Sequence, residues 1–460
     1  MSAENDEYMT EESEADLVDS DASDDDIPSL AAFCHDVQMD CVFDGQCERL
    51  CAAPGSGCLD LMYIESLWQE AAVEDAPVDD SAILNLLRCA AESQDDPQAE
   101  FEGMKHITLS CVSAVAAMGC SIVIVEKCPG VLRSPPTHAL AAPRAAQDST
   151  LQHFHIVNCN PVNSGVPVAD GVLEGVRAIA DAASSSLESL LLPGNNWPKV
   201  PLTISMPWPL LEALDLSGSS FGGLQMPATG SASSVLPQLR ELSLARCDHL
   251  RPSDVYTLLD HCPELTHLDV GGIKVQWGLL LQALQACPQL QALAVGSCDQ
   301  LWNQPSDASP ACASSTYHPY PPQPPHLQLL TLSATGMQDG HLAAALGVPP
   351  GGSLAPCEAL EMLDVSSNYA LTVDCVAAVA AAHMGSHGPG GSDEAGDGAG
   401  GLQCIVIAES SLLEAPLRSA MVAVLSQRWG GGDSAVGAAG DAVNALEVEI
   451  HGQNLFWQAM

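Results

Sequence analysis

The chain has 460 residues, which is enough for one large core or for two domains. It carries 58 acidic and 14 basic side chains, so its net charge is −44 when histidines are neutral. Such a negative charge, without a visible basic patch, argues against binding to DNA, RNA or anionic lipid.

The sequence predicts neither a secretory signal nor a membrane-spanning segment. Residues 1–26 are acidic and polar, which is the reverse of a secretory signal. The chain has no run of about 18 apolar residues, so we predict no membrane-spanning helix. Without a signal, the 18 cysteines are expected to be reduced thiols. These features favour a cytoplasmic protein, with the nucleus, the cytoskeleton or a cilium as alternative locations.

The N-terminal part is the most acidic. Residues 1–28 hold 12 acidic side chains and no lysine or arginine, which predicts a disordered acidic tail. Residues 29–102 contain short amphipathic patterns and are predicted to form a helical N-terminal region that caps the rest of the chain. This region also holds five cysteines without C-x2-C spacing, so ordinary thiols are favoured over a zinc site: Cys34, Cys41, Cys47, Cys51 and Cys58.

A repeated pattern organises the centre of the chain. Near-copies of the motif L-x-x-L-x-L-x-x-C begin at Leu239, Leu265 and Leu290, at spacings of 26 and 25 residues. Leu268 and Val270 are two residues apart, so a strand places both on the buried face. The run 275–286 has helical spacing. One strand and one helix cannot bury an apolar face alone, so the copies are expected to stack, with a small cysteine in the turn between them.

This pattern resembles the leucine-rich-repeat family, in particular its cysteine-containing, ribonuclease-inhibitor-like and F-box-associated subtype. The resemblance implies an α/β solenoid: a curved parallel sheet with helices on the convex side. It also implies a non-catalytic protein-interaction scaffold, such as a substrate-recognition or adaptor protein of a ubiquitin ligase. Residues 29–102 are then the place where a ligase adaptor would dock. The alternative is an architectural repeat protein of the cytoskeleton or of the cilium axoneme.

Weaker copies extend the predicted solenoid over residues 103–460. Strands are predicted at 104–112 and 120–128, which start only 16 residues apart, so one of them is expected to be a capping strand. Further strands begin at Leu151, Leu187, Leu211, Leu327, Leu360 and Leu402, and a last one spans 445–450. Helices are predicted at 168–183, after an N-terminal cap at Thr372, and at 416–429. Loop insertions are predicted at 129–150, 303–326, 386–401 and 430–441. The proline-rich insertion 303–326 is read as a plain loop, with a docking peptide as the alternative.

The sequence lacks the common motifs of catalysis and cofactor binding. The sequence has no phosphate-binding loop, dinucleotide fingerprint, H-E-x-x-H or G-x-S-x-G motif. His153 and His155 alternate on one strand face, and a structural role is favoured over metal binding. We therefore predict no enzyme activity, no catalytic residue, no cofactor and no metal site.

The remaining candidate is the surface formed by outward-facing strand positions. In successive repeats these positions are mostly acidic, which favours another protein with a basic surface as the partner. The alternative is that strand alternation simply requires polar residues there. On the binding hypothesis, Asp215→Lys, Asp269→Lys and Asp364→Lys together are expected to keep the fold and abolish binding. The candidate residues are Glu188, Glu212, Asp215, Arg240, Ser243, His267, Asp269, Gln291, Thr331, Glu361 and Asp364.

Overall fold

The structure is a computed structural model of the chain. The acidic tail 1–28, the N-terminal cysteines and most of the predicted helical region lie outside the described residues, as do the central parts of the insertions at 129–150, 303–326 and 386–401. The described residues are 98–104, 107–133, 150–160, 168–197, 199–204, 207–226, 234–303, 323–346, 359–384, 401–410, 412, 414–429 and 432–449.

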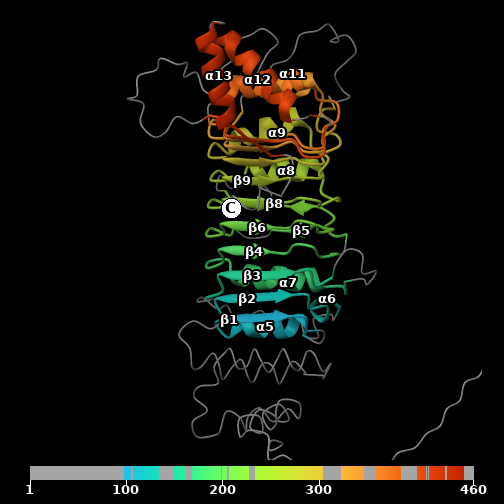
Figure 1. Cartoon of the computed structure of the whole chain (residues 1–460). Coiled ribbons are helices and arrows are strands. Elements are labelled where there is room, and N and C mark those ends of the chain that lie inside the picture. The colour runs from blue at the N-terminus through green and yellow to red at the C-terminus, as the bar shows by residue number, and fades with distance from the viewer. Residues whose placement is uncertain are drawn as a thin grey trace, which may run out of the picture.

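One parallel sheet of 12 strands runs through the described residues, and each strand pairs with the next one of the sheet along the chain (Figure 1). Such an order needs no crossover, because every repeat adds one strand beside the previous one. The strands are β1 Gln98–Glu102, β2 Ile122–Glu126, β3 His153–Val157, β4 Ser189–Leu191, β6 Ala213–Asp215, β8 Glu241–Ser243, β9 His267–Asp269, β10 Ala292–Ala294, β11 Leu329–Thr331, β12 Met362–Asp364, β13 Cys404–Val406 and β14 Glu447–Glu449.

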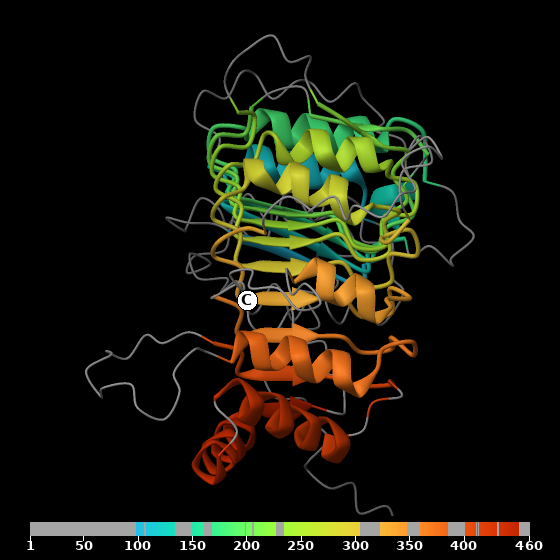
Figure 2. The same ribbon diagram turned by 90° about the horizontal axis from the view of Figure 1, so that it is seen from above.

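Helices form the outer layer, and the sheet forms the inner, concave wall. In Figure 1 the blue-to-green strands are stacked from bottom to top, whereas Figure 2 separates the yellow-to-red strands, so the direction of stacking turns along the chain. The result is a curved parallel sheet with helices on the convex side, as the sequence predicts. The helices are α5 Leu109–Ala117, α6 Gly130–Arg133, α7 Val172–Ala182, α8 Pro252–Leu259, α9 Trp277–Ala283 with η3 Leu284–Ala286, α10 Asp339–Ala345, α11 Val373–His383, α12 Glu414–Arg428 and α13 Asp433–Ala445.

Between β4 and β8 the outer layer contains two short strands. A small sheet of β5 (Leu202–Thr203) and β7 (Leu224–Gln225) lies there. Trp197, Trp208 and Phe221 are buried beside it, and the rings of Trp197 and Phe221 stack with centroids 5.5 Å apart. Large aromatic side chains thus fill space in these repeats.

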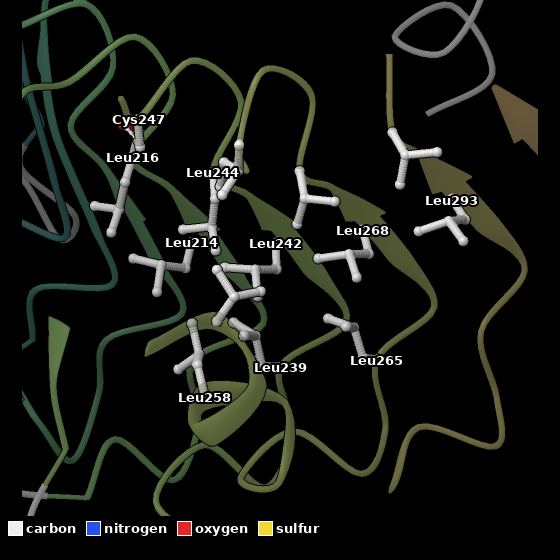
Figure 3. Close-up of a cluster of buried hydrophobic side chains, with 14 of the residues drawn as sticks. Leu214, Leu216, Leu239, Leu242, Leu244, Cys247, Leu258, Leu265, Leu268 and Leu293 are labelled. Carbon is white, nitrogen blue, oxygen red and sulfur yellow. Dashed lines mark hydrogen bonds between the residues drawn. The ribbon is translucent and has the colours of Figure 1, made fainter. Parts of the chain in front are cut away.

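The leucines of the repeated motif form one continuous core. Leu214, Leu242, Leu268 and Leu293 lie at the same register on neighbouring strands and are at most 2% exposed. Figure 3 shows these side chains in a row beside Leu258 of α8. Burying each leucine contributes about 1.5 to 3 kcal/mol, so the ladder is a main source of stability. The predicted inward direction of Leu268 and Val270 is confirmed.

The turn after each strand has a recurring geometry. Its residue before the ninth motif position has a positive φ in every repeat from β2 to β13, including Arg246 at 57° and Gly272 at 78°. Where the ninth residue of the motif is cysteine, its thiol bonds to the preceding repeat: Cys247 Sγ donates to the Leu216 carbonyl at 3.0 Å. Asn368 makes two hydrogen bonds to the preceding repeat: its amide donates to Leu332 O, and its oxygen accepts from Thr335 N. Cysteine fills this turn, as predicted, in the repeats that end at Cys247 and Cys298, whereas Ile273 fills it in the repeat between them.

Two predictions at the N-terminal end of the solenoid are wrong. The boundary between 29–102 and 103–460 falls inside the sheet, because residues 98–102 form β1, with Ala99 and Phe101 buried. The predicted strand at 104–112 is instead the start of α5. Leu109, Val112 and Val115 follow each other at intervals of three and bury one helical face, and Thr108 Oγ1 accepts from Cys111 N at the helix start.

A third prediction fails at the other end of the chain. Residues 430–441 are not a loop insertion, because α13 begins at Asp433 and runs to Ala445. Glycine lowers helix propensity there, but Ala435, Ala439 and Val443 at intervals of four form a buried face. Arg418 of α12 also donates to the carbonyl of Val443 at 2.7 Å. Tertiary packing therefore overrides the weak local propensity. The predicted loop at 129–150 likewise opens with the short helix α6.

The other described helices agree with the sequence. Those predicted at 168–183, 275–286 and 416–429 correspond to α7, α9 with η3, and α12. Thr372 caps α11, since its hydroxyl accepts from Cys375 N at 3.3 Å. Among the described residues, no helix is both long and apolar enough to cross a membrane.

The leucine ladder predicts a sharp contrast between two substitutions. Leu268→Asp places an unpaired charge at a fully buried site and removes a core side chain, so we expect a loss of about 4 kcal/mol or more. Leu279→Asp makes the same chemical change at a site on α9 that is 42% exposed, and we expect little effect. Thermal unfolding followed by circular dichroism compares them, and equal melting temperatures for the two variants would contradict the ladder.

Candidate protein-binding surface

Strand register decides which side chains reach the concave face. In β6, Ala213 and Asp215 flank the buried Leu214 and point away from the core. Asp215 is aligned with Ser243 of β8 and Asp269 of β9, while Ala213 is aligned with Glu241 and His267. The face is therefore made of rows that cross the strands.

The eleven predicted residues lie in or next to strands β4 to β12, so the sheet places them along one face. They differ in exposure. Glu212, Arg240 and Gln291 are exposed, whereas Ser243 and Asp269 are only 3% and 8% exposed. The remaining six are partly buried: Glu188, Asp215, His267, Thr331, Glu361 and Asp364.

The three aspartates have a structural role that the sequence did not reveal. In Asp215, Asp269 and Asp364 one carboxylate oxygen accepts from the backbone N–H two residues later, at 2.8 Å in each case. This local bond closes the turn that ends the strand. Lysine cannot accept such a bond, and at position 269 it would also bury a cation. These bonds argue against the expectation that the three lysine substitutions keep the fold, which stays a prediction.

Burial also changes the charge state of these carboxyls. Burial raises the pKa of Asp269 to about 6, and the negative charge of Asp215 adds to the effect, while the bond from Gly271 and the cation of Arg246 oppose it. Burial likewise raises the pKa of Asp215 and of Asp364. Asp269 therefore loses its negative charge under mildly acidic conditions.

Exposed negative charge on the concave face comes mainly from glutamates. Glu212 and Glu241 are both exposed, and Glu212 lies 3.9 Å from Arg240, a pair too solvated to add much stability. Glu241 was missed because the prediction used the second and fifth motif positions and took the third position only in the repeat that contains His267. The third position faces the same way as the fifth, so the strand period of two was the signal that would have found it.

A second group of glutamates lies at the N-terminal end of the face. Glu100 and Glu102 come from β1 and Glu126 from β2. Lys127 bonds to Glu102 at 2.9 Å and to Glu126 at 2.8 Å, and these hydrogen bonds raise its pKa. Glu100 and Glu102 were missed because β1 was not predicted, and Glu126 was missed because the predicted face did not include the strand at 120–128.

The C-terminal part of the concave face is apolar instead. Ala292, Ala294 and Leu329 form one cluster on β10 and β11. Cys404, Val406 and Ala408 form another on and after β13. Met362 of β12 packs against both clusters, which makes one patch. We call these seven residues the apolar patch. The face thus has an acidic part and an apolar part.

The two histidines on β3 behave as structural residues. His155 Nε2 lies 2.9 Å from Ser189 Oγ, and the ring centroids of His153 and His155 are 6.2 Å apart. Burial, together with the nearby His153, lowers the pKa of His155 to about 4, so the ring is neutral. Within the described residues, no group of three or more His, Cys, Asp or Glu is arranged to hold a metal ion.

Comparison with known proteins gives resemblance only to solved structures. No protein-family model matches the chain, and no curated protein matches it. The mouse RP105/MD-1 complex aligns at 14% identity and a TM-score of 0.39, over 72% of this chain and 45% of that one. The TLR13–ssRNA13 complex aligns at 15% and 0.37, over 70% and 36%. The Rad7 and Elc1 complex in yeast aligns at 12% and 0.30, over 87% and 91%. This chain spans less than half the length of the first two.

These likenesses are too distant to assign a partner, so the chain itself decides the fold. Its motif leucines stand in register along one curved parallel sheet, with one turn geometry in successive repeats. This is a leucine-rich-repeat fold. Membership of the cysteine-containing subtype stays a prediction of the motif. The leucine-rich-repeat sheet offers its concave wall as the candidate binding surface.

Asp269 gives a test of the charge assignment. Because its folded pKa lies above the unfolded value, protonation favours the folded state; this contribution is complete below about pH 4 and is lost as the pH rises through 6. Asp269→Asn keeps the acceptor oxygen and removes the charge. We expect it to raise the free energy of unfolding by about 1 to 3 kcal/mol at neutral pH and to flatten the pH dependence below it.

Chemical denaturation across this pH range measures the free energy of unfolding of each variant. Asp248→Asn, at an exposed site, is the matched control and should change stability by less than about 0.5 kcal/mol. A loss of stability in Asp269→Asn at neutral pH would show that the carboxylate is favourably paired and that its pKa is not raised.

Proposed function

We propose that this leucine-rich-repeat chain is a non-catalytic scaffold whose concave face binds a protein with a basic surface. The observation that carries the proposal is the exposed acidic part of that face, where Glu212 and Glu241 extend from neighbouring strands. A solenoid presents an extended inner wall to partners, and complementary charge favours association and fixes orientation.

The alternative is that these residues are polar only because strands require it. That explanation suits Asp215, Asp269 and Asp364, whose carboxylates hold backbone turns. Glu212 and Glu241 instead extend into solvent, where the fold does not require an acid. Their charge is therefore the part of the surface that selection for a partner explains better.

The pathway is a finer proposal with less support. Resemblance to the cysteine-containing subtype favours a substrate-recognition role in a ubiquitin ligase, and the predicted adaptor-docking region 29–102 lies almost entirely outside the described residues. Co-purification with a ligase adaptor would support that role. Retention in a detergent-resistant cytoskeletal fraction would support the architectural role instead. Exclusion of nucleic acid and a cytoplasmic location stay predictions of the sequence, and titration with RNA and cell fractionation test them.

Charge reversal tests the binding face. The partner is first identified by affinity purification and mass spectrometry from the native source, then purified and titrated against the full chain. Glu212→Lys with Glu241→Lys should weaken binding by at least about tenfold, because both changes place cations opposite a basic partner. Wild-type binding should also weaken with added salt.

A matched control separates local charge from net charge. Asp260→Lys with Glu264→Lys makes the same total charge change at exposed sites in the loop between α8 and β9, away from the concave rows. This control should bind as the wild type does. An equal loss of binding affinity in both double variants would mean that only net charge matters. Undiminished binding by the Glu212→Lys, Glu241→Lys variant would refute the proposed face.

A further inference from the structure

The apolar patch on the concave face is buried. Val406 is 2% exposed, Ala294 is 5% exposed and Leu329 is 7% exposed. These side chains alternate along their strands with core residues such as Leu293 and Ile405, so they point away from the hydrophobic core. The core of the solenoid therefore does not bury them. Met362, which packs against both clusters, belongs to the sheet itself.

Exposure differs between the apolar patch and the N-terminal strands at some positions of the same register. Ala213 of β6 and Ala292 of β10 are the same residue type at the same register of the sheet. Ala213 is partly exposed, whereas Ala292 is only 5% exposed. Leu191 and Ala294, which also share a register, differ in the same direction. Burial is not confined to the patch, because Ser189, Ser243 and Asp269 on the same face are 9%, 3% and 8% exposed, while Met362 inside the patch is partly exposed. What distinguishes strands β10 to β13 is the apolar character of these side chains, so a segment that covers them must itself be apolar.

The segment that follows β14 has the sequence and the position for this role. It reads I-H-G-Q-N-L-F-W-Q-A-M over residues 450–460, with Leu455, Phe456 and Trp457 in a row. It has no Asp, Glu, Lys or Arg, which suits an apolar patch in a chain of net charge −44. β14 lies beside β13, at one edge of the patch.

Residues 450–460 are also long enough to cross the apolar patch. Crossing from β14 to β10 takes four strand spacings, or roughly 19 Å. Eleven extended residues span up to roughly 36 Å.

The other apolar insertion starts on the wrong side of the sheet. Residues 304–322 contain Tyr317 and Tyr320 and follow Trp302. The Trp302 ring packs against Trp277 of α9, with centroids 5.7 Å apart, and stacks on His341 of α10 at 5.0 Å. Both helices belong to the convex layer, so Trp302, just before this insertion, lies on the convex side.

We propose that segment 450–460 lies across the apolar patch as an internal ligand, with Phe456 and Trp457 against Leu329, Met362 and Val406. A partner that uses this part of the concave face must first displace the segment. The contact is a claim beyond the proposed function and needs no partner to be true. Its test therefore fails or succeeds independently of partner binding.

The thiol of Cys404 provides the measurement, since it lies inside the patch and is 6% exposed. Alkylation by N-ethylmaleimide, followed residue by residue with mass spectrometry, reports access to it. The full chain is compared with its Phe456→Ser, Trp457→Ser variant. We expect Cys404 to react at least about tenfold faster in the variant, because its cover is lost. Cys247 and Cys298, in the strand-ending turns, should stay protected and report an intact fold.

The full chain carrying Tyr317→Ser and Tyr320→Ser is the matched control and should leave the Cys404 rate unchanged. The proposal is overturned if Phe456→Ser with Trp457→Ser does not accelerate Cys404, or if the tyrosine variant accelerates it instead. If Cys247 also becomes reactive, a second measurement decides. Photoreactive p-benzoylphenylalanine in place of Phe456 should cross-link to the peptide that contains Met362, and cross-links confined to other parts of the chain would refute the contact.

Discussion

Contact between neighbouring repeats is the constraint on which the whole molecule depends. A strand of three residues and one short helix have too little apolar surface to fold alone. Leu214, Leu242 and Leu268 become buried only because each lies between the leucines of the repeats on either side. Backbone bonds follow the same direction: Leu216 N donates to Ser243 O, and Leu244 N donates to Asp269 O. Stability is therefore shared along the stack and does not belong to any single repeat.

The same stacking decides what the concave face can do. Every repeat must end its strand in a tight turn, and the aspartates at 215, 269 and 364 supply oxygens that hold the backbone there. The acidic character of the face is thus partly a by-product of folding. What folding does not require is the exposed charge of Glu212 and Glu241, or an apolar patch that points away from the core. Those two features carry the functional argument.

The sequence predicted the parts of the fold that repeat strongly. Leu268 and the Thr372 cap could be placed because local spacing alone determines them. β1 was missed because only Ala99 and Phe101 mark its buried face, and α13 was missed because packing against α12 stabilises a glycine-rich helix. The buried state of Asp269 and the apolar patch depend on register between strands, which no single repeat contains. Site prediction therefore needed the three-dimensional alignment of distant residues.

Hydrogen exchange of the backbone amides tests the central claim most directly. The amides of Leu216, Leu244 and Val270 each donate to a carbonyl of the following repeat, at 2.9, 2.8 and 2.9 Å. In the intact chain all three are predicted to exchange at least about a thousandfold more slowly than in an unfolded chain, because exchange requires opening of the stack. Exchange of any of these amides at the unfolded rate, in a chain that keeps its helical circular dichroism, would contradict a continuous registered sheet.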